Sequence, residues 1–279
     1  MQVFRDAGSM RHFTRLHRGA GRTVGFVPTM GALHAGHLEL VRRARELSDT
    51  VVLSIFVNPM QFNVRSDFDR YPRDIDSDCS LARDAGVAAV YAPAQADMYP
   101  DGFDTRVHVE RTAAPLEGSG RPGHFDGVST VVTKLLNAVE PDVAVFGRKD
   151  FQQLAVVSRM TRDLDMAVRI VGVETVREPD GLALSSRNVR LSAAARSEAP
   201  AIHRALIGAL TAMNSGATPA GAKAVFLDAM TEAPSARVEY VSVADADTLE
   251  ELDVTRSPAV ISCAVWFDDV RLIDNVLLT

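Results

Sequence analysis

The chain has 279 residues, of which 47% are hydrophobic and 24% are charged, and these fractions are typical of a folded protein and exclude wholesale disorder. The 30 Lys and Arg residues stand against 36 Asp and Glu residues, and the net charge of −6 argues against a general binder of nucleic acid or anionic membranes. The two cysteines, Cys79 and Cys263, lie far apart, and no apolar run approaches the roughly 20 residues that span a bilayer. We therefore expect a cytoplasmic protein without a disulfide framework or a zinc knuckle.

From residue 23 onward, short β-rich runs alternate with segments of helical period. The runs predict strands at 23–29, 50–58, 87–93, 143–147 and 167–176, and helices at 36–49, 74–86, 128–142 and 152–165. Such alternation is typical of βαβ units with right-handed crossovers, so we expect an α/β fold with a mostly parallel sheet.

The pattern changes after residue 188. Helical patterns cover 192–213 and 219–231, and strand patterns cover 237–249 and 259–278, with a hairpin turn at 268–270. We expect a separate small α+β domain here, with the boundary near Val176.

Four polar segments follow predicted strands at the points where the strands end. They are "PTMGALHAGH" at 28–37, "NPMQFN" at 58–63, "GRKDFQQ" at 147–153 and "EPDGLALSSRN" at 178–188. Because the carboxyl ends of parallel strands meet at one edge of a sheet, we expect these segments to form one site.

The first segment has the features of a phosphate site. A strand, a glycine-bearing turn and a helix start place free N–H groups and the positive end of the helix dipole beside an anion. His34 and His37 lie one helical turn apart and could stabilise the charge that develops on a pentavalent phosphorus. Gly31 and Gly36 would let the nucleotide approach the backbone closely.

Two other interpretations of these histidines stay open. They could simply decorate a turn, or they could bind a metal ion together with a carboxylate such as Asp150. A metal site is the weaker hypothesis, because a catalytic zinc ion usually needs three protein ligands and the chain has no HExxH motif.

The third and fourth segments carry charges and hydroxyls suited to a nucleotide. Lys149 fits triphosphate oxygens and Asp150 fits a ribose hydroxyl. Ser185, Ser186 and Arg187 offer hydroxyls and a guanidinium to phosphate oxygens. Taken alone, the first pair could be a solvated loop and the second group a turn, with Ser192 capping the helix that follows.

Glutamines are the candidates for a second substrate. The amides of Gln61, Gln152 and Gln153 could bind a polar or carboxylate compound, although isolated glutamines are normally surface residues. His124 lies within the glycine-rich stretch "EGSGRPGHFDGV", which could be a loop that covers a site, and His108 precedes it.

Six stretches, in order and spacing, resemble the motifs of the pantothenate synthetase (pantoate–β-alanine ligase) family of the HxGH nucleotidylyltransferase superfamily. They are "PTMGALHAGH", "SIFVNPMQF", "YPRD", "RPGHFDGV", "VFGRKDFQQL" and "VREPDGLALSSRN", and they cover most of residues 23–192. The resemblance implies a Rossmann-like parallel sheet with helices on both faces in residues 1–175. It also implies a smaller C-terminal α+β domain in residues 176–279 that covers the active site.

The resemblance further implies a homodimer that uses ATP and Mg²⁺ and has no nucleic-acid or membrane partner. Pantoate would attack the α-phosphorus of ATP to give pantoyl adenylate and pyrophosphate, and β-alanine would then displace AMP. The protein ligands of the metal stay unassigned.

The roles of individual residues also come from the resemblance. His37 would be the proton donor, and Gln61 and Gln153 would hold pantoate, with Gln61 also near β-alanine. The backbone of Val176 would contact adenine. The remaining residues expected to contact ATP are Met30, Gly31, Ala32, Leu33, His34, Ala35, Gly36, Gly147, Arg148, Lys149, Asp150, Leu184, Ser185, Ser186 and Arg187.

The chain departs from the family pattern at Ala35, Arg148 and Leu184, where Glu, Glu or Gln, and Met are common. Arg148 adds positive charge beside Lys149, which bears on nucleotide affinity. Two rival functions are another HxGH-class nucleotidyltransferase or adenylate-forming enzyme with a different acid, and a nucleotide-binding regulator without turnover. The segments "NPMQF" and "DFQQ" argue against the first rival, and the retained set of polar side chains argues against the second.

Overall fold

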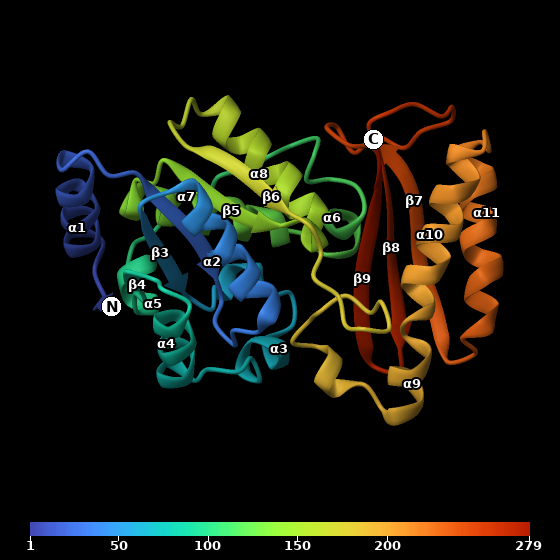
Figure 1. The fold of residues 1–279 in the computed structure, drawn as a ribbon, viewed down its shortest axis with the longest axis horizontal. Helices are drawn as coiled ribbons and strands as arrows, with labels where there is room; N and C mark the ends of the chain where they lie inside the picture. The colour runs from blue at the N-terminus through green and yellow to red at the C-terminus, as the bar shows by residue number, and fades with distance from the viewer. The chain divides into compact units, whose positions relative to one another are not determined.

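The computed structural model describes residues 1–279, apart from the side chain of Ser66. The chain divides into two compact units (Figure 1). Unit 1 comprises Met1–Ala113, Glu117–Gly147 and Val156–Val173, and unit 2 comprises Ala114–Leu116, Arg148–Ala155 and Glu174–Thr279. The boundary expected after residue 175 falls two residues beyond the end of unit 1, and the short segment around Lys149 belongs to unit 2.

Unit 1 is built on a parallel sheet whose strands, over the described chain, lie in the order β1-β4-β3-β2-β5-β6. Their bounds are β1 (Gln2–Phe4), β2 (Val24–Thr29), β3 (Thr50–Ile55), β4 (Ala89–Tyr91), β5 (Val143–Gly147) and β6 (Arg169–Val173). The chain runs outward from β2 through β3 to β4 and starts again on the other side of β2 with β5. The strand order therefore reverses between β2 and β5, and ligands of such sheets bind outside the carboxyl ends of the strands at that point.

Helices cover both faces of this sheet (Figure 1). Val27 of β2 packs with Leu40 and Val41 in an apolar cluster that also includes Cys79. Strand side chains alternate, so the buried Phe26 points to the opposite face, where α1 and α7 pack against β2 and each other. The helices are α1 (Ala7–Gly19), α2 (Ala35–Leu47), α3 (Arg65–Asp69), α4 (Ile75–Asp84), α5 (Gln95–Met98), α6 (Glu117–Gly120), α7 (His124–Val139), α8 (Phe151–Asp163) and the 3₁₀ turn η1 (Pro59–Gln61).

The Rossmann-like α/β fold expected from the sequence is confirmed. The sequence pattern showed no sign of β1 and α1, and α7 begins at His124, four residues before the predicted start. β6 ends at Val173, three residues before the predicted end of that strand.

Unit 2 contains an antiparallel sheet in the order β7-β8-β9 with two longer helices on one face (Figure 1). Leu206 and Phe226 on the helices pack with Ile261 of β8 in one core, and Phe151 packs with Val260 in a separate cluster. The elements are β7 (Ala236–Asp245), β8 (Ala259–Phe267), β9 (Val270–Leu278), α9 (Ala193–Glu198), α10 (Ala201–Asn214), α11 (Pro219–Ala229), η2 (Arg148–Asp150), η3 (Asn188–Arg190) and η4 (Met230–Glu232).

Two local expectations for unit 2 have different outcomes. The turn predicted near Asp268 is confirmed, since Asp268 has a φ of 52° between β8 and β9. The single helix predicted at 192–213 is wrong, because the chain forms α9 and α10 with Pro200 between them. A proline has no amide hydrogen to donate and its ring clashes with the carbonyl four residues earlier, so α9 ends before it.

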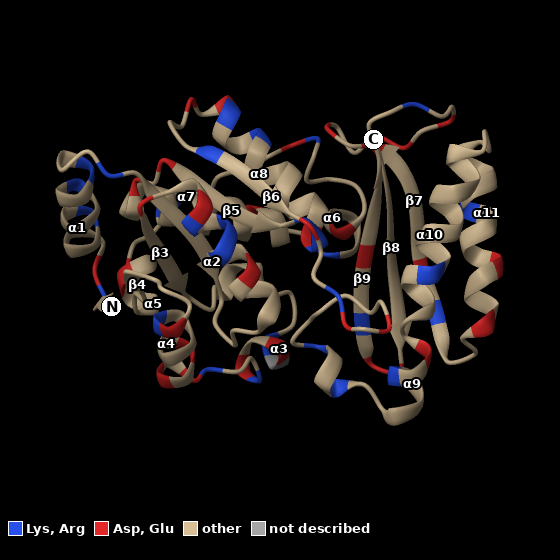
Figure 2. Cartoon of the chain, viewed as in Figure 1, with Lys and Arg blue, Asp and Glu red and all other residues tan. Residues whose placement is uncertain are grey.

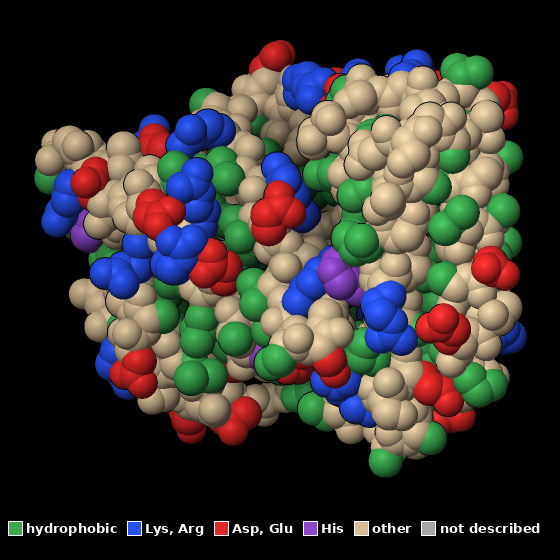
Figure 3. Space-filling model, turned by 45° about the vertical axis from the view of Figure 1, so that its right-hand side comes forward, with side chains coloured by type: hydrophobic (Ala, Val, Ile, Leu, Met, Phe, Trp, Pro, Cys, Tyr) green, Lys and Arg blue, Asp and Glu red, His purple; other side chains and the backbone are tan. Residues whose placement is uncertain are grey.

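Charged side chains of both signs are spread over the elements (Figure 2), and the face drawn in Figure 3 shows them interspersed. On α2, Arg42 pairs with both Glu39 and Glu46. Such pairs place positive and negative charges side by side. The face drawn in Figure 3 therefore has no broad basic surface, in agreement with the net charge of −6. Within the described part of the chain, every helix is too short or too polar to span a bilayer.

Gly25 of β2 allows the close packing of α2 on the sheet. A Cβ at this position would lie 2.2 Å from Ser48 Oγ and 3.3 Å from the carbonyl oxygen of Ala44. We expect Gly25→Ala to lower the free energy of unfolding by about 1–3 kcal/mol through overpacking, measured by denaturant titration. Gly19→Ala is the matched control, because a Cβ there meets nothing within 4 Å. Equal stability of the two variants would contradict this account of the packing.

Candidate active site

The turn between β2 and α2 is held by a buried carboxylate. Asp78 of α4 is 4% exposed and accepts the backbone N–H groups of Ala32 and Leu33 at 2.9 and 2.8 Å. Gly31 and Ala32 both have positive φ values, 84° and 52°, so the turn is left-handed. A Cβ on Gly31 would lie 2.7 Å from Asp78 Oδ2, and only glycine therefore fits beside the carboxylate.

The two histidines of the turn both accept backbone N–H groups at the start of α2. His34 is the N-cap residue, and its Nδ1 accepts the Gly36 N–H at 3.1 Å. His37 Nδ1 accepts the His34 N–H at 3.3 Å, and the two ring centroids are 4.1 Å apart. Because each Nδ1 is an acceptor, each neutral ring carries its proton on Nε2. The pair therefore offers two N–H donors of defined tautomer at the start of a helix.

The side-chain amide of Gln61 has one orientation because Asn58 fixes it. Asn58 is 1% exposed, its Oδ1 accepts the Tyr99 hydroxyl at 2.8 Å and the Met60 N–H at 3.3 Å, and its Nδ2 donates to Gly127 O at 3.0 Å. That same Nδ2 donates to Gln61 Oε1 at 3.1 Å. The contact with Asn58 directs Oε1 toward the protein, so Nε2 is the group of Gln61 best placed to donate a hydrogen bond to a ligand.

The first and second polar segments meet at this glutamine. Gln61 Nε2 lies 3.2 Å from the sulfur of Met30, and the segments follow the neighbouring strands β2 and β3. A Cβ at Gly127 of α7 would lie 2.5 Å from Met60 O, so α7 packs directly on the backbone of η1. Burial also raises the pKa of the Tyr99 hydroxyl, which keeps it a donor to Asn58 at neutral pH.

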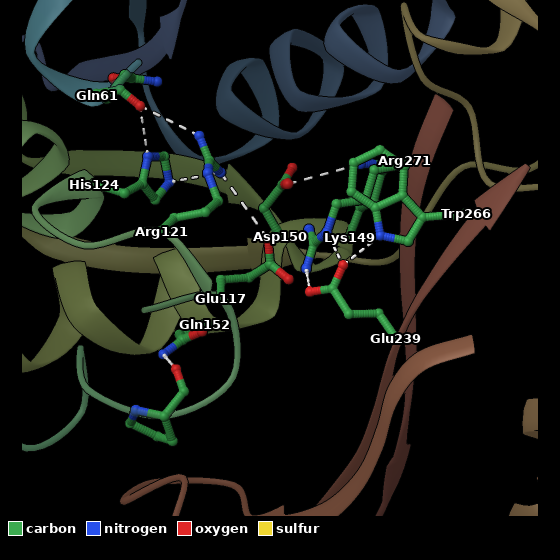
Figure 4. Close-up of polar contacts among 11 residues, drawn as sticks. Gln61, Glu117, Arg121, His124, Lys149, Asp150, Gln152, Glu239, Trp266 and Arg271 are labelled. Carbon is green, nitrogen blue, oxygen red and sulfur yellow. Dashed lines mark hydrogen bonds and ion pairs between the residues drawn. The ribbon is translucent and has the colours of Figure 1, made fainter. Parts of the chain in front are cut away.

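The backbone of Gln61 is held by a second set of contacts (Figure 4). His124 Nδ1 lies 2.8 Å from Gln61 O, and Arg121 Nη2 donates to the same oxygen at 3.2 Å. Arg121 Nη1 donates to His124 Nε2 at 3.1 Å and lies 4.0 Å from Glu117 Oε2. His124 is buried and positions Gln61, whereas His108 is an exposed residue paired with Asp126 at 2.7 Å.

In unit 2, the third and fourth polar segments line one pocket. Lys149, Ser185 and Arg187 share it with Arg271, a residue to which no sequence signal pointed. Lys149 Nζ lies 3.6 Å from Asp150 Oδ1 and its side chain is 17% exposed. The pocket lining is Lys149, Leu182, Ala183, Ser185, Arg187, Asn188, Ile202, His203, Arg271, Leu272, Ile273 and Asp274. The lining can bind an anion, because it contains three cationic side chains and its one carboxylate, Asp274, is already paired with Arg177.

A carboxylate sets the position of Arg271 (Figure 4). Glu239 accepts from Arg271 Nη2 at 2.8 Å and Nε at 2.9 Å, and it also accepts from the Trp266 indole. The hydrogen bond from Arg271 holds the pKa of Glu239 below its ordinary value. Burial and the charge of Arg177 lower the pKa of His203, so that ring is neutral at pH 7.

Several sequence candidates have local structural contacts. Gln152 is buried and donates to Pro115 O at 2.7 Å, so it stabilises unit 2 (Figure 4). Ser185 Oγ accepts the Arg187 N–H at 3.2 Å, and Ser192 caps α9 as predicted. The carbonyl of Val176 accepts the Leu184 N–H at 2.9 Å.

The alternative metal site has no support in the described residues, where no three His, Cys, Asp or Glu side chains form a group that could hold an ion. His34 and Asp150 in particular belong to different units.

Comparisons with known proteins agree over the whole chain. The pantoate–β-alanine ligase family model matches residues 2–277. The chain belongs to the pantoate–β-alanine ligase family. The pantothenate synthetases of Pelotomaculum thermopropionicum and Moorella thermoacetica are 49% and 47% identical over 279 residues, which is 100% of this chain and 99% of each relative. As a member of this family, the protein is a ligase of pantothenate biosynthesis.

Solved structures of the family have the same fold. The pantothenate synthetase of Thermus thermophilus superposes with a TM-score of 0.93 at 46% identity, covering 99% of both chains. A pantoate–β-alanine ligase from Francisella tularensis, complexed with β-γ ATP and β-alanine, gives 0.79 at 31% identity, covering 99% of this chain and 97% of that one.

The three departures from the family pattern are accommodated locally. Ala35 is the first residue of α2, a position without a side-chain requirement. Arg148 pairs with Glu174, so its charge is matched by a carboxylate. Leu184 is half-buried, and its N–H takes part in the backbone hydrogen bond to Val176.

The ligase has residues in its site that sequence reasoning missed, namely Asp78, Asn58, Tyr99 and Arg271. The sequence does contain one indication that Asp78 has a structural role. It lies three residues after Ile75 and four before Ala82, on the apolar face of the predicted helix, where an unpaired carboxylate would be costly. Asn58 stands within a polar segment but carried no sign of its structural role.

We expect Asp78→Asn to damage the turn between β2 and α2. The new amide would place an N–H₂ group against a backbone N–H and leave it unsatisfied, at a cost of about 1–3 kcal/mol. Overall ligase activity should therefore fall, together with a modest loss of thermal stability. Asp76 lies on the same helix and is exposed, so Asp76→Asn serves as the control. Similar activity of the two variants would show that the carboxylate does not hold the turn.

Proposed function

We propose that the ligase works in two steps through a pantoyl adenylate. In the first step a carboxylate oxygen of pantoate bonds to the α-phosphorus of ATP, and the bond to pyrophosphate breaks. In the second step the amine of β-alanine bonds to the acyl carbon, AMP leaves, and the amine loses a proton. ATP and β-alanine as substrates are supported by the ligands of the Francisella tularensis relative.

The observation that carries this proposal is the placement of the two histidine rings at the start of α2. His34 and His37 use Nδ1 to cap α2, which leaves the proton on Nε2. An Nε2–H donor at a helix start stabilises negative charge as it develops on phosphate oxygens. We assign proton donation toward the departing pyrophosphate to His37, with His34 as a second donor. Met30, Gly31, Ala32, Leu33, Ala35 and Gly36 form the backbone around the nucleotide.

In unit 2 the pocket around Lys149 supplies the cations for phosphate oxygens. Lys149 and Arg187 contribute charge and Ser185 contributes a hydroxyl. We assign a second hydroxyl to Ser186, which lies between Ser185 and Arg187 in the chain. Asp150 would accept from a ribose hydroxyl. The carbonyl of Val176 already accepts a hydrogen bond, so its N–H is the group for an adenine nitrogen acceptor. Gly147, Arg148 and Leu184 complete the expected nucleotide contacts.

Pantoate binding is assigned to Gln61 and Gln153. The fixed orientation of Gln61 makes it a donor, which suits a carboxylate or a hydroxyl oxygen. Gln61 is also the residue we place near β-alanine. Gln153 is half-buried at the start of α8.

We propose Mg²⁺ as a companion of the nucleotide. Magnesium prefers phosphate and water oxygens and needs few protein ligands, so the triphosphate would hold it and it would offset phosphate charge. We further propose a cytoplasmic homodimer. Both cysteines are buried and neither forms a disulfide, which fits a reducing compartment. The functional division into a catalytic domain of residues 1–175 and a smaller covering domain of residues 176–279 stays a prediction.

The order of the two steps can be tested by isotope exchange. Labelled pyrophosphate should enter ATP when pantoate and Mg²⁺ are present and β-alanine is absent. His37→Ala should reduce this exchange by about 10²–10³-fold, because a positioned donor to the leaving group is lost. His108→Ala, which changes an exposed histidine, is the control.

Two outcomes would contradict the adenylate mechanism. Exchange that requires β-alanine would favour a concerted ligase. Exchange that proceeds equally without pantoate would favour a different nucleotidyl transfer.

Variants of the adjacent residues Gln152 and Gln153 can distinguish an effect on substrate binding from an effect on stability. Gln153→Ala should raise the KM for pantoate and leave the KM for ATP nearly unchanged, since a lost substrate hydrogen bond costs about 1–3 kcal/mol. Gln152→Ala should instead lower the melting temperature, because its bond to Pro115 is buried. Equal effects of Gln153→Ala on both KM values would show that Gln153 does not bind pantoate.

A further inference from the structure

We propose that Asp274 and Asn275, adjacent residues of β9, are positioning residues for ATP that hold the two phosphate-binding segments of unit 2 in place. The inference rests on the proposed function, since it takes Lys149 and Arg187 to contact ATP phosphates. Neither Asp274 nor Asn275 belongs to a motif that the sequence singled out.

Asn275 holds the Lys149 segment through both hydrogens of one nitrogen. Its Nδ2 donates to the carbonyl oxygens of Arg148 and Lys149, each at 2.9 Å. Asn275 is 7% exposed, so these bonds do not compete with bulk water. Two successive peptide planes are thereby fixed, and they determine the direction in which the Lys149 side chain leaves the backbone.

Asp274 holds the Ser185–Arg187 segment through Arg177. Arg177 donates to Asp274 Oδ2 at 2.6 Å and Oδ1 at 3.0 Å, a bidentate pair in which the carboxylate is 4% exposed. The same Arg177 Nη1 donates to Gly181 O at 3.1 Å. Arg177 also pairs with Ala183 in an isolated β-bridge, so the ion pair fixes the base of the strand-like turn that leads to Ser185.

The geometry of a β-strand explains how the adjacent residues Asp274 and Asn275 can contact two different segments of the chain. Successive residues of a strand point to opposite faces of the sheet. Asp274 pairs with Cys263, which belongs to the core beneath α10, whereas Leu277 on the face of Asn275 packs with Phe151 just beyond Lys149. One β9 dipeptide therefore reaches from both faces to the segments that line the pocket.

A double-mutant cycle tests the link between Asn275 and Lys149. Pyrophosphate exchange into ATP is measured with the full chain as wild type, Lys149→Ala, Asn275→Ala and the double variant. We expect each single change to lower exchange at least about tenfold, because small misplacements of a charge at a reacting group are costly. The double variant should be no slower than Lys149→Ala within about twofold, since Asn275 acts through that lysine.

Further measurements distinguish positioning from general support of the fold. Asn275→Ala should raise the KM for ATP and leave the KM for pantoate unchanged. Asn275→Ser keeps one donor and should fall between wild type and Asn275→Ala, which also covers the case that the alanine variant does not fold. Ser262→Ala is the matched control, because Ser262 is buried and directly opposite Asn275 on β8.

Several outcomes would overturn the inference. Multiplying losses in the double variant, wild-type exchange in both Asn275 variants, or a loss of thermal stability without a change in exchange would each do so. Unchanged exchange in Lys149→Ala would be a failure of a different kind, because it would refute the proposed role of Lys149 and remove the premise of the inference.

Discussion

The hydrogen bonds from the backbone of Ala32 and Leu33 to the buried carboxylate of Asp78 are the constraint on which the nucleotide chemistry depends. Ala32, a non-glycine residue with a φ of 52°, is strained in this turn, and such a conformation persists only when its surroundings hold it. With the turn held, His34 falls at the N-cap of α2 and His37 one turn later. The tautomers of both rings then follow from the capping bonds.

A similar arrangement occurs at Gln61. Its side chain receives a donor from Asn58, and its backbone carbonyl receives donors from His124 and Arg121. Neither set of contacts touches the group that we assign to the substrate. Fixing a flexible glutamine in advance lowers the entropy lost on binding, so under the proposed role of Gln61 this buried polar network would contribute to pantoate affinity without contacting the ligand.

In unit 2 the positioning comes from strand β9. Two cations of the pocket, Lys149 and Arg187, lie on short irregular segments, η2 and the residues around Ser185. β9 is paired with β8 along its whole length, so it is rigid by comparison. The side chains of Asp274 and Asn275 hold the two irregular segments against this strand through hydrogen bonds. Glu239 of β7 holds the Arg271 side chain in the same manner. Under the proposed roles of Lys149 and Arg187, these buried polar contacts would position groups that bind ATP.

The sequence by itself determined the α/β alternation, the parallel sheet, the family and the polar segments at strand ends, because hydrophobic period and motif spacing are local properties of the chain. It also indicated the cap of Ser192 and the turn at Asp268. Only the tertiary structure decided that Lys149 belongs with the C-terminal unit, that Gln152 and His124 are structural, and that Asp78, Asn58 and Asn275 support the site. These roles arise from hydrogen bonds between residues that lie 37 to 127 positions apart, and no periodicity along the chain encodes such pairs.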